Sequence, residues 1–196
     1  MKIQTTNKFE LTFKTKSQNG LILYTGNGNL NSYLLIAFIS GKLVYSFSLP
    51  KQKQVFTLSS PTRLNDNKWH SIIMERNKRK ATLTIDGSVK LNATFDEINY
   101  VGFGNLATDG YLRIGGFRKL PFGMAQSLHQ GFQGCMFEFK IDDRLIDLIK
   151  HNLNTNYYPS LCSAMNGTNE QKIKKVREKN STKKQVTLRP GFFWSI

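Results

Sequence analysis

Apolar residues recur at every second position through most of this 196-residue chain before residue 150. Residues 9–13 alternate in this way, and residues 43–49 do the same. A side-chain period of two is typical of β-strands with one buried face, because successive side chains on a strand point to opposite sides. Helical periodicity is almost absent, and one or two turns at 147–152 are the only helix that we expect.

Turn-forming residues separate these apolar runs at short intervals. Asn19-Gly20 and Ser40-Gly41 mark two turns, and Asp86-Gly87 is a typical hairpin pair because both residues tolerate a positive φ. The expected strands cover residues 9–13, 21–25, 33–39, 42–49, 55–58, 69–76, 81–86, 88–92, 99–103, 111–115 and 134–141. About ten short strands spaced like this predict an all-β fold, either a two-sheet sandwich or a barrel.

Charge and composition change at residue 162. The chain carries 28 Lys and Arg against 13 Asp and Glu, and its net charge of +15 favours anionic partners such as sulfated glycan, nucleic acid or acidic lipid. Residues 163–196 are basic and poor in aliphatic side chains, so burial there cannot offset the entropy lost on ordering. We therefore predict one domain over residues 1–162 and a disordered basic tail over 163–196.

Three sequons bear on the compartment. Asn92, Asn166 and Asn180 are each followed two residues later by Thr, and each is a glycosylation acceptor if the chain enters the secretory pathway. Residues 1–15 lack the apolar region of a signal peptide, and no apolar run reaches the roughly 18 residues of a membrane helix. The chain is thus either cytosolic or part of a longer secreted protein, and the sequons favour the secreted alternative.

Several segments occur in the order found in one extracellular module. They are Phe9-Glu-Leu-Thr-Phe-Lys-Thr15, Asn19-Gly-Leu-Ile-Leu-Tyr24, Tyr33-Leu-Leu-Ile36, Gly41-Lys-Leu-Val-Tyr-Ser-Phe47, Leu64-Asn-Asp-Asn-Lys-Trp-His70, Glu75-Arg76, Ala81-Thr-Leu-Thr-Ile-Asp-Gly87, Tyr111-Leu-Arg-Ile-Gly-Gly116 and Gly131-Phe-Gln-Gly-Cys-Met136. Together these segments, over about residues 8–162, resemble the laminin G-like domain shared by laminin α chains, agrin, perlecan, neurexins and Slit.

The resemblance implies a jelly-roll, concanavalin-like sandwich of two curved antiparallel sheets, which agrees with the strand count. It also implies a disulfide between Cys135 and Cys162. Closing that loop of about 27 residues contributes roughly 3 kcal/mol in the chain-entropy model. Two reduced cysteines in a cytosolic protein remain the alternative. Either way, two cysteines are too few for a zinc finger.

Many members of the family bind Ca²⁺ at the rim of the sandwich through two Asp or Asn side chains. Ser32 falls at the first of these positions and Ala107 at the second, although Asn105 or Asp109 substitutes for Ala107 if the loop shifts by two residues. The backbone carbonyls of such a site fall at Leu49 and Phe103. Because Ca²⁺ needs six to eight oxygens with carboxylates among them, we expect no tight calcium site and no other cofactor.

Catalytic residues are not suggested by the pattern. His70, His129 and His151 are scattered, and no nucleophile stands at motif spacing from any of them. Glu138 and Asp142 are an acidic pair on one predicted strand, and an offset of four places both on one face. Glycosidases need such a pair, but no flanking acidic residue completes a pattern. We predict that the protein is not an enzyme.

Four cations cluster at one predicted hairpin. Arg76, Lys78, Arg79 and Lys80 surround its turn, and their mutual repulsion is relieved when an anion joins them. The alternative is an ordinary solvated hairpin end that guards against strand pairing. Further cations fall on other loops, at Lys14, Lys16, Lys51, Lys53, Arg118 and Lys119.

We therefore predict a non-enzymatic extracellular module for adhesion or matrix binding. Its expected partner is an anionic, heparan sulfate-like glycan or a cell-surface receptor or matrix protein. A receptor-binding module with weak calcium dependence is the alternative. Nucleic-acid binding is remote, because no RNP1-like run stacks aromatics on an exposed sheet, and we expect no direct insertion into a membrane.

Overall fold

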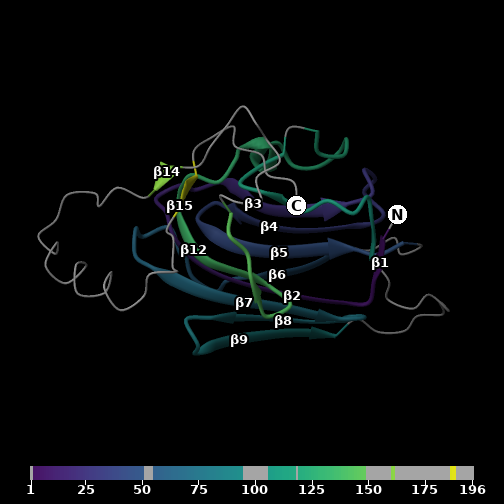
Figure 1. The fold of residues 1–196 in the computed structure, drawn as a ribbon, viewed down its shortest axis with the longest axis horizontal. Coiled ribbons are helices and arrows are strands. Elements are labelled where there is room, and N and C mark those ends of the chain that lie inside the picture. The colour runs from purple at the N-terminus through teal and green to yellow at the C-terminus, as the bar shows by residue number, and fades with distance from the viewer. Residues whose placement is uncertain are drawn as a thin grey trace, which may run out of the picture.

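Two antiparallel sheets stack face to face in this protein (Figure 1). The computed structural model describes residues 2–50, 55–94, 106–117, 119–148, 160–161 and 186–188. The smaller sheet has the strand order β11-β3-β4-β5-β6. Its strands are β11 (Arg113–Ile114), β3 (Gly20–Gly26), β4 (Tyr33–Ile39), β5 (Lys42–Ser48) and β6 (Phe56–Ser59).

The larger sheet has the order β14-β15-β12-β2-β7-β8-β9, with β13 also paired to β12. Its strands are β14 (Ser160–Leu161), β15 (Val186–Leu188), β12 (Gly134–Ile141), β13 (Arg144–Leu145), β2 (Thr6–Lys14), β7 (His70–Asn77), β8 (Lys80–Ile85) and β9 (Val89–Thr94). A separate pair, β1 (Lys2–Gln4) with β10 (Leu106–Thr108), lies at one end of the sandwich.

The main core lies between the facing sides of the two sheets. On β2, Phe9, Leu11 and Phe13 are buried while their neighbours along the strand are partly exposed, as the period of two predicts. Phe13 meets Phe38 of β4 edge to face, with ring centroids 5.2 Å apart. Each such side chain contributes about 1.5–3 kcal/mol when fully buried, so the alternating runs hold the two sheets together.

A second apolar layer covers the outer side of the smaller sheet. Every residue of β3 is buried, and so is nearly all of β4. Tyr24 and Leu35 pack on that outer side against Leu120 and Leu128, and Leu128 belongs to the 3-10 helix η1 (Gln126–His129). Strands buried on both faces have no reason to alternate, which explains why β3 and β4 read as nearly continuous apolar runs.

A β-bulge interrupts the alternation of β12. Glu138 has a φ of 55°, and the pairing with β2 shifts register between Phe137 and Lys140. The extra residue turns Phe139 into the core, three positions after the buried Met136. Asp142 follows the strand at a φ of 48°. The assumption that Glu138 and Asp142 share one face of a regular strand is therefore wrong.

The predicted all-β, two-sheet antiparallel sandwich is confirmed. The expected strands at 33–39 and 134–141 match β4 and β12 at both ends, and most others differ by a residue or two at an end. The sequence did not predict β1, β10, β13, β14 or η1. The expected strand at 99–103 lies outside the described residues, as does the expected helix at 147–152 beyond its first two residues.

One short strand lies within the predicted tail. Val186–Leu188 forms β15, which pairs with β12 on one side and with β14 on the other. The expected disordered tail thus contains one short paired strand, and the rest of 163–196 lies outside the described residues. Within the described ranges, no helix has the length and apolar character needed to cross a membrane.

Candidate functional site

At the rim position where related domains bind calcium according to the resemblance, Ser32 and Ala107 contact each other. Ser32 is fully buried between the ends of β3 and β4. Its Oγ donates to the Ala107 carbonyl at 2.7 Å and accepts the Ala107 N–H at 2.8 Å. The two residues that the resemblance assigns to the metal thus satisfy each other's hydrogen bonds.

The nearby carboxylate of Asp109 is also engaged. It accepts hydrogen bonds from both terminal nitrogens of Arg113, at 2.6 and 3.2 Å, and from the Tyr111 N–H. Partial burial raises the pKa of Asp109, but the bonds from Arg113 outweigh it and hold the pKa below its usual value. The Arg113 guanidinium in turn lies 4.2 Å from the ring centroid of Phe117.

This set of donors does not fit calcium in the way the resemblance implies. Ser32 offers one neutral oxygen that is already bonded, Ala107 has no side-chain oxygen, and Asp109 is paired with a cation. Asn105 and Phe103 lie outside the described residues. In the described part of the chain, no three His, Cys, Asp or Glu side chains gather closely enough to hold a metal.

Large apolar side chains are exposed around the same rim. Leu30 and Tyr111 keep 42% and 49% of their surface exposed, and Phe122 is fully exposed. Leu30 packs close to the turn that contains Phe122. Its Cδ1 lies only 3.1 Å from the position that a Cβ on Gly123 would take. Sequence reasoning missed these residues. Leu30 and Phe122 fall in loops where an apolar residue has no core to join, whereas Tyr111 was assigned to an expected strand and lies just before β11.

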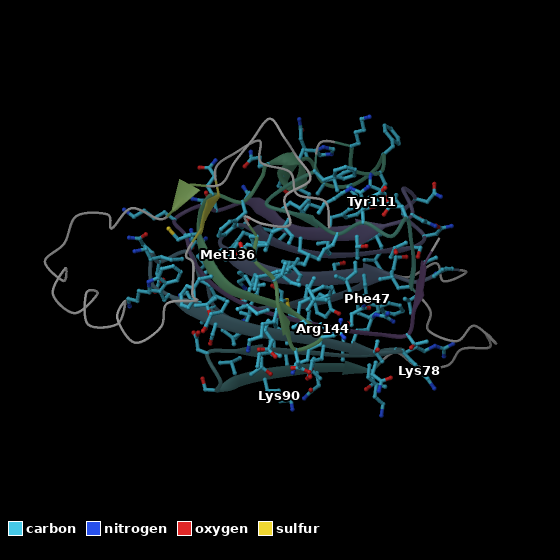
Figure 2. The ribbon with its side chains drawn as sticks, in the orientation of Figure 1. Phe47, Lys78, Lys90, Tyr111, Met136 and Arg144 are labelled. Atoms are coloured by element: carbon cyan, nitrogen blue, oxygen red, sulfur yellow. The ribbon has the colours of Figure 1, made fainter. Side chains whose placement is uncertain are left out.

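The basic hairpin joins β7 to β8. We call Lys78, Arg79 and Lys80 the basic tip; Lys78 and Lys80 are exposed, and Arg79 is half-buried. Figure 2 shows Lys78 at the outer end of the hairpin. The Lys78 N–H donates to the Thr5 carbonyl at 2.7 Å, so the tip is anchored to the segment between β1 and β2.

Arg76 does not belong to this surface, contrary to the sequence prediction. It is 1% exposed and points into the sandwich with Ile72 and Met74. Its Nε and Nη2 donate to Asn7 Oδ1 at 2.9 and 2.6 Å, and its Nη1 donates to the Lys78 carbonyl at 3.0 Å. Burial lowers the pKa of Arg76, yet a guanidinium stays charged in proteins. Alternation along 72, 74 and 76 is the signal that places Arg76 in the core.

Lys90 is a cation that sequence reasoning missed. It is exposed on β9 opposite Thr84 of β8. Thr84 and Lys80 are four residues apart on β8 and so point to the same side of the sheet. Lys90, as the partner of Thr84, points to that side too, which is the outer face of the sheet. The pairing of β8 with β9 reveals this, and the Asp86-Gly87 turn that sets the pairing was readable in the sequence.

The other predicted cations are dispersed. Lys14 lies 5.6 Å from the ring centroid of Trp69, which meets Phe137 at 4.8 Å. Lys16 and Lys119 are exposed on other loops. The remaining candidates, Lys51, Lys53 and Arg118, lie outside the described residues.

The best-placed histidine is held between two carboxylates. His70 Nδ1 lies 2.8 Å from Asp86 Oδ2, and Nε2 lies 2.9 Å from Asp66 Oδ1. Burial lowers the pKa of His70, but these hydrogen bonds outweigh it and raise the pKa above its usual value. The two ring nitrogens therefore link the β8–β9 turn, which contains Asp86, to the loop before β7, which contains Asp66. His129 ends η1, and His151 lies outside the described residues.

The structure describes Cys135 and Asn92 among the cysteines and sequons of the predicted disulfide and N-glycans. Cys135 lies on β12 opposite Lys14 of β2 and Thr187 of β15. Asn92 is exposed on β9. Cys162, Asn166 and Asn180 lie outside the described residues, so the disulfide and these two sequons stay predictions.

Comparison with protein families settles the relationship. Residues 13–144 match the family model described as the laminin G domain, and this stretch is more than half of the chain. The chain belongs to the laminin G domain family. The match includes the basic tip, the Ser32–Ala107 contact and Asn92, and it confirms the resemblance seen in the sequence.

Known relatives support the assignment. This laminin G domain is 32% identical over 146 residues to neurexin-2 of mouse and of human, an alignment that covers 72% of the chain and 8% of each relative. It is 31% identical over 141 residues to Drosophila neurexin 1, covering 68% of the chain and 7% of that protein. The chain thus spans less than a tenth of the length of these curated relatives.

Solved structures share the fold. Domains LG4-5 of the mouse laminin α1 chain superpose with a TM-score of 0.62 at 25% identity, over 75% of this chain and 38% of that one. The LG1-3 region of the laminin α2 chain gives a TM-score of 0.60 at 20% identity, over 74% and 28%. The laminin G jelly roll is therefore the fold of this protein.

Proposed function

We propose that this laminin G domain is a non-enzymatic extracellular adhesion or matrix-binding module that recognises an anionic, heparan sulfate-like glycan through the basic tip. The observation that carries the proposal is the exposure of Lys78 and Lys80 on either side of Arg79. Charge-assisted bonds to sulfate and carboxylate are the interactions such a group makes best. The net charge of +15 adds long-range attraction for a polyanion.

Rigid support of the tip favours binding. Two hydrogen bonds hold the backbone at Lys78, one from its own N–H to Thr5 and one from Arg76 to its carbonyl. A loop already fixed in place loses less conformational entropy when a ligand binds. Arg76 therefore contributes by positioning the tip from inside the sandwich.

We propose that glycan binding needs no calcium and no other cofactor. Support comes from the rim, where Ser32 bonds to Ala107 and Asp109 pairs with Arg113. Titration calorimetry with Ca²⁺, alone and with heparin present, tests this. A Ca²⁺-dependent gain in heparin affinity would contradict it.

An extracellular location implies two covalent features. We propose a Cys135–Cys162 disulfide and N-glycans at Asn92, Asn166 and Asn180. The β14 strand, which ends one residue before Cys162, lies in the same sheet as Cys135. Peptide mass spectrometry of protein secreted from animal cells measures all four, and reduced thiols with no attached sugar would refute the extracellular location.

A receptor-binding function is the second candidate, favoured by the exposed Leu30, Tyr111 and Phe122 at the rim. Aromatic side chains are enriched among the residues that dominate protein interfaces. A receptor held by this surface loses little affinity in high salt, whereas a polyanion held by the tip loses much. Salt dependence therefore separates the two candidates.

The test is heparin affinity chromatography of the full chain. The triple variant Lys78→Ser, Arg79→Ser, Lys80→Ser should elute at clearly lower salt than the wild type. The matched control removes three exposed lysines elsewhere, at Lys16, Lys42 and Lys119, and should elute close to the wild type. Equal shifts for both variants would mean that only net charge matters and would refute a site at the tip. Competition by heparan sulfate but not by nucleic acid rules out the remote alternative of a nucleic-acid partner.

A further inference from the structure

The sequon at Asn92 lies on the same outer face as the basic tip. Asn92 is exposed on β9 and pairs with Thr82 of β8, and Thr94 pairs with Lys80. Since side chains two apart on a strand share a face, the pairing register places Asn92, Lys80 and Lys90 together on the outer side of the large sheet. In the described strand order, β9 is the terminal strand of that sheet.

Asn92 lies between two of the cations on this face. Lys90 is two residues before it on β9, and Lys80 is its diagonal neighbour on β8. In an antiparallel pair such neighbours are about 7–8 Å apart, so each lysine lies within reach of the first sugar on Asn92. Figure 2 shows Lys78 and Lys90 on the side of the molecule where Figure 1 places β8 and β9.

Acidic side chains on this face are engaged elsewhere: Glu75 of β7 accepts a hydrogen bond from Thr82 at 3.3 Å, and Asp86 bonds to His70 at 2.8 Å. The basic tip and Lys90 together carry four positive charges on or beside this face. A polyanion that spans Lys80 and Lys90 must therefore pass over Asn92.

We propose that an N-glycan on Asn92 covers the path between Lys80 and Lys90 and weakens polyanion binding, so that occupancy of this sequon regulates the site. The inference rests on the proposed function, because it assumes that the basic tip binds a polyanion. An N-glycan is bulky and hydrated, and it blocks the approach of a chain as stiff and charged as a sulfated glycan without contacting the lysines strongly itself.

The modification is an ordinary group transfer. Asn92 Nδ2 forms a bond to the anomeric carbon of an oligosaccharide carried on a lipid diphosphate. The bond from that carbon to the diphosphate oxygen breaks, the lipid diphosphate leaves with the electron pair, and Nδ2 loses one proton. The Thr94 hydroxyl completes the acceptor motif, and Thr94 is exposed beside Asn92 on β9.

The test uses the full chain secreted from animal cells, with Asn166→Gln and Asn180→Gln so that Asn92 holds the sole sequon. Two further variants remove that sequon independently, Asn92→Gln and Thr94→Ala. Heparin affinity is measured for all three proteins, and mass spectrometry reports the occupancy of Asn92. Enzymatic removal that converts Asn to Asp is avoided, because the new carboxylate would itself repel heparin.

We expect the glycosylated protein to bind heparin about five- to tenfold more weakly than both sequon variants, since it loses one or two cation contacts. Equal affinity for all three proteins, or an unmodified Asn92 in the secreted protein, would overturn the inference while leaving the proposed function intact. No binding by any of them would overturn both. Equal melting temperatures show that the comparison concerns folded protein.

Discussion

Replacing Arg76 tests the distinction between a glycan ligand and a residue of the core. The Arg76→Ala variant removes two hydrogen bonds to Asn7 Oδ1, at 2.9 and 2.6 Å, and one to the Lys78 carbonyl at 3.0 Å. It also removes the guanidinium that lies 5.9 Å from the ring centroid of Phe47. All of these groups lie at the end of the sandwich that supports the basic tip.

The expected loss can be worked out from these contacts. A hydrogen bond that involves a charged group contributes about 1.5–3 kcal/mol, and leaving buried acceptors unpaired adds a similar cost. The contacts share partners, so their energies do not add in full. We expect Arg76→Ala to lower the free energy of unfolding by about 3–5 kcal/mol, from the lost hydrogen bonds and the cavity that Ala leaves. Arg76→Met should lose less, because its apolar side chain fills much of the space that Ala leaves empty.

Urea denaturation followed by tryptophan fluorescence, with the disulfide state held constant, measures this loss. Lys80→Ala is the control, and its exposed side chain should change the free energy by no more than about 0.5 kcal/mol. A double-mutant cycle with Asn7→Ala should give a coupling of about 1–3 kcal/mol. If Arg76→Ala were as stable as Lys80→Ala, the buried role would be refuted. A folded Arg76→Met protein should elute from heparin at only slightly lower salt than the wild type, because the bond from Lys78 to Thr5 still holds the tip. A shift as large as that of Lys80→Ala would indicate that Arg76 contacts the ligand directly.

Three further predictions use the same stability assay. Ser32→Ala should lower the free energy of unfolding by about 1–3 kcal/mol, because both polar groups of Ala107 lose their partner; an unchanged urea midpoint would contradict this. The pKa of His70 is higher in the folded state than in the unfolded state, where it is near 6.5. Protonated His70 therefore stabilises the fold in full below about pH 6.5, and this stabilisation is lost as pH rises through the folded pKa. The urea midpoint should therefore fall as pH rises above about 6.5 in the wild type, and a slope equally steep in His70→Gln would refute the assignment. Gly134→Ala should destabilise far more than Gly87→Ala, since its Cβ would overlap a backbone oxygen of β2 whereas Gly87 faces open space; similar losses would show that the strand relaxes at little cost.

Local patterns predicted most of the sandwich because its strands are set by alternation and turn residues. The Asp86-Gly87 pair fixed the β8–β9 hairpin, and both residues take the positive φ that the pair suggests. The bulge at Glu138 was not predictable in the same way. No residue type marks it, and it exists because Phe139 and Met136 must both reach the core.

The candidate site was predicted less well than the fold, because it depends on which face each cation takes. Arg76 stands in a run of charged residues and looks like part of an exposed turn. Its burial follows from the strand continuing three residues past Met74, the last apolar position, with Asn7 on β2 supplying the acceptor. Lys90 has no charged neighbours within three residues on either side, and only the register of β8 with β9 brings it to the face of Lys80.

Strand β1 explains why the two candidate surfaces lie at the same end of the sandwich. Its three residues are too few to show a period, so the long-range pairing with β10, in which Ile3 lies opposite Ala107, makes them a strand. Ala107 is the residue bonded to Ser32 at the rim, and Thr5, just after β1, accepts the Lys78 N–H at the tip. Figure 1 shows β1 crossing that end between the two sheets. A short backbone path therefore connects rim and tip, so a change in the pairing of β1 with β10 should affect the support of both candidate surfaces.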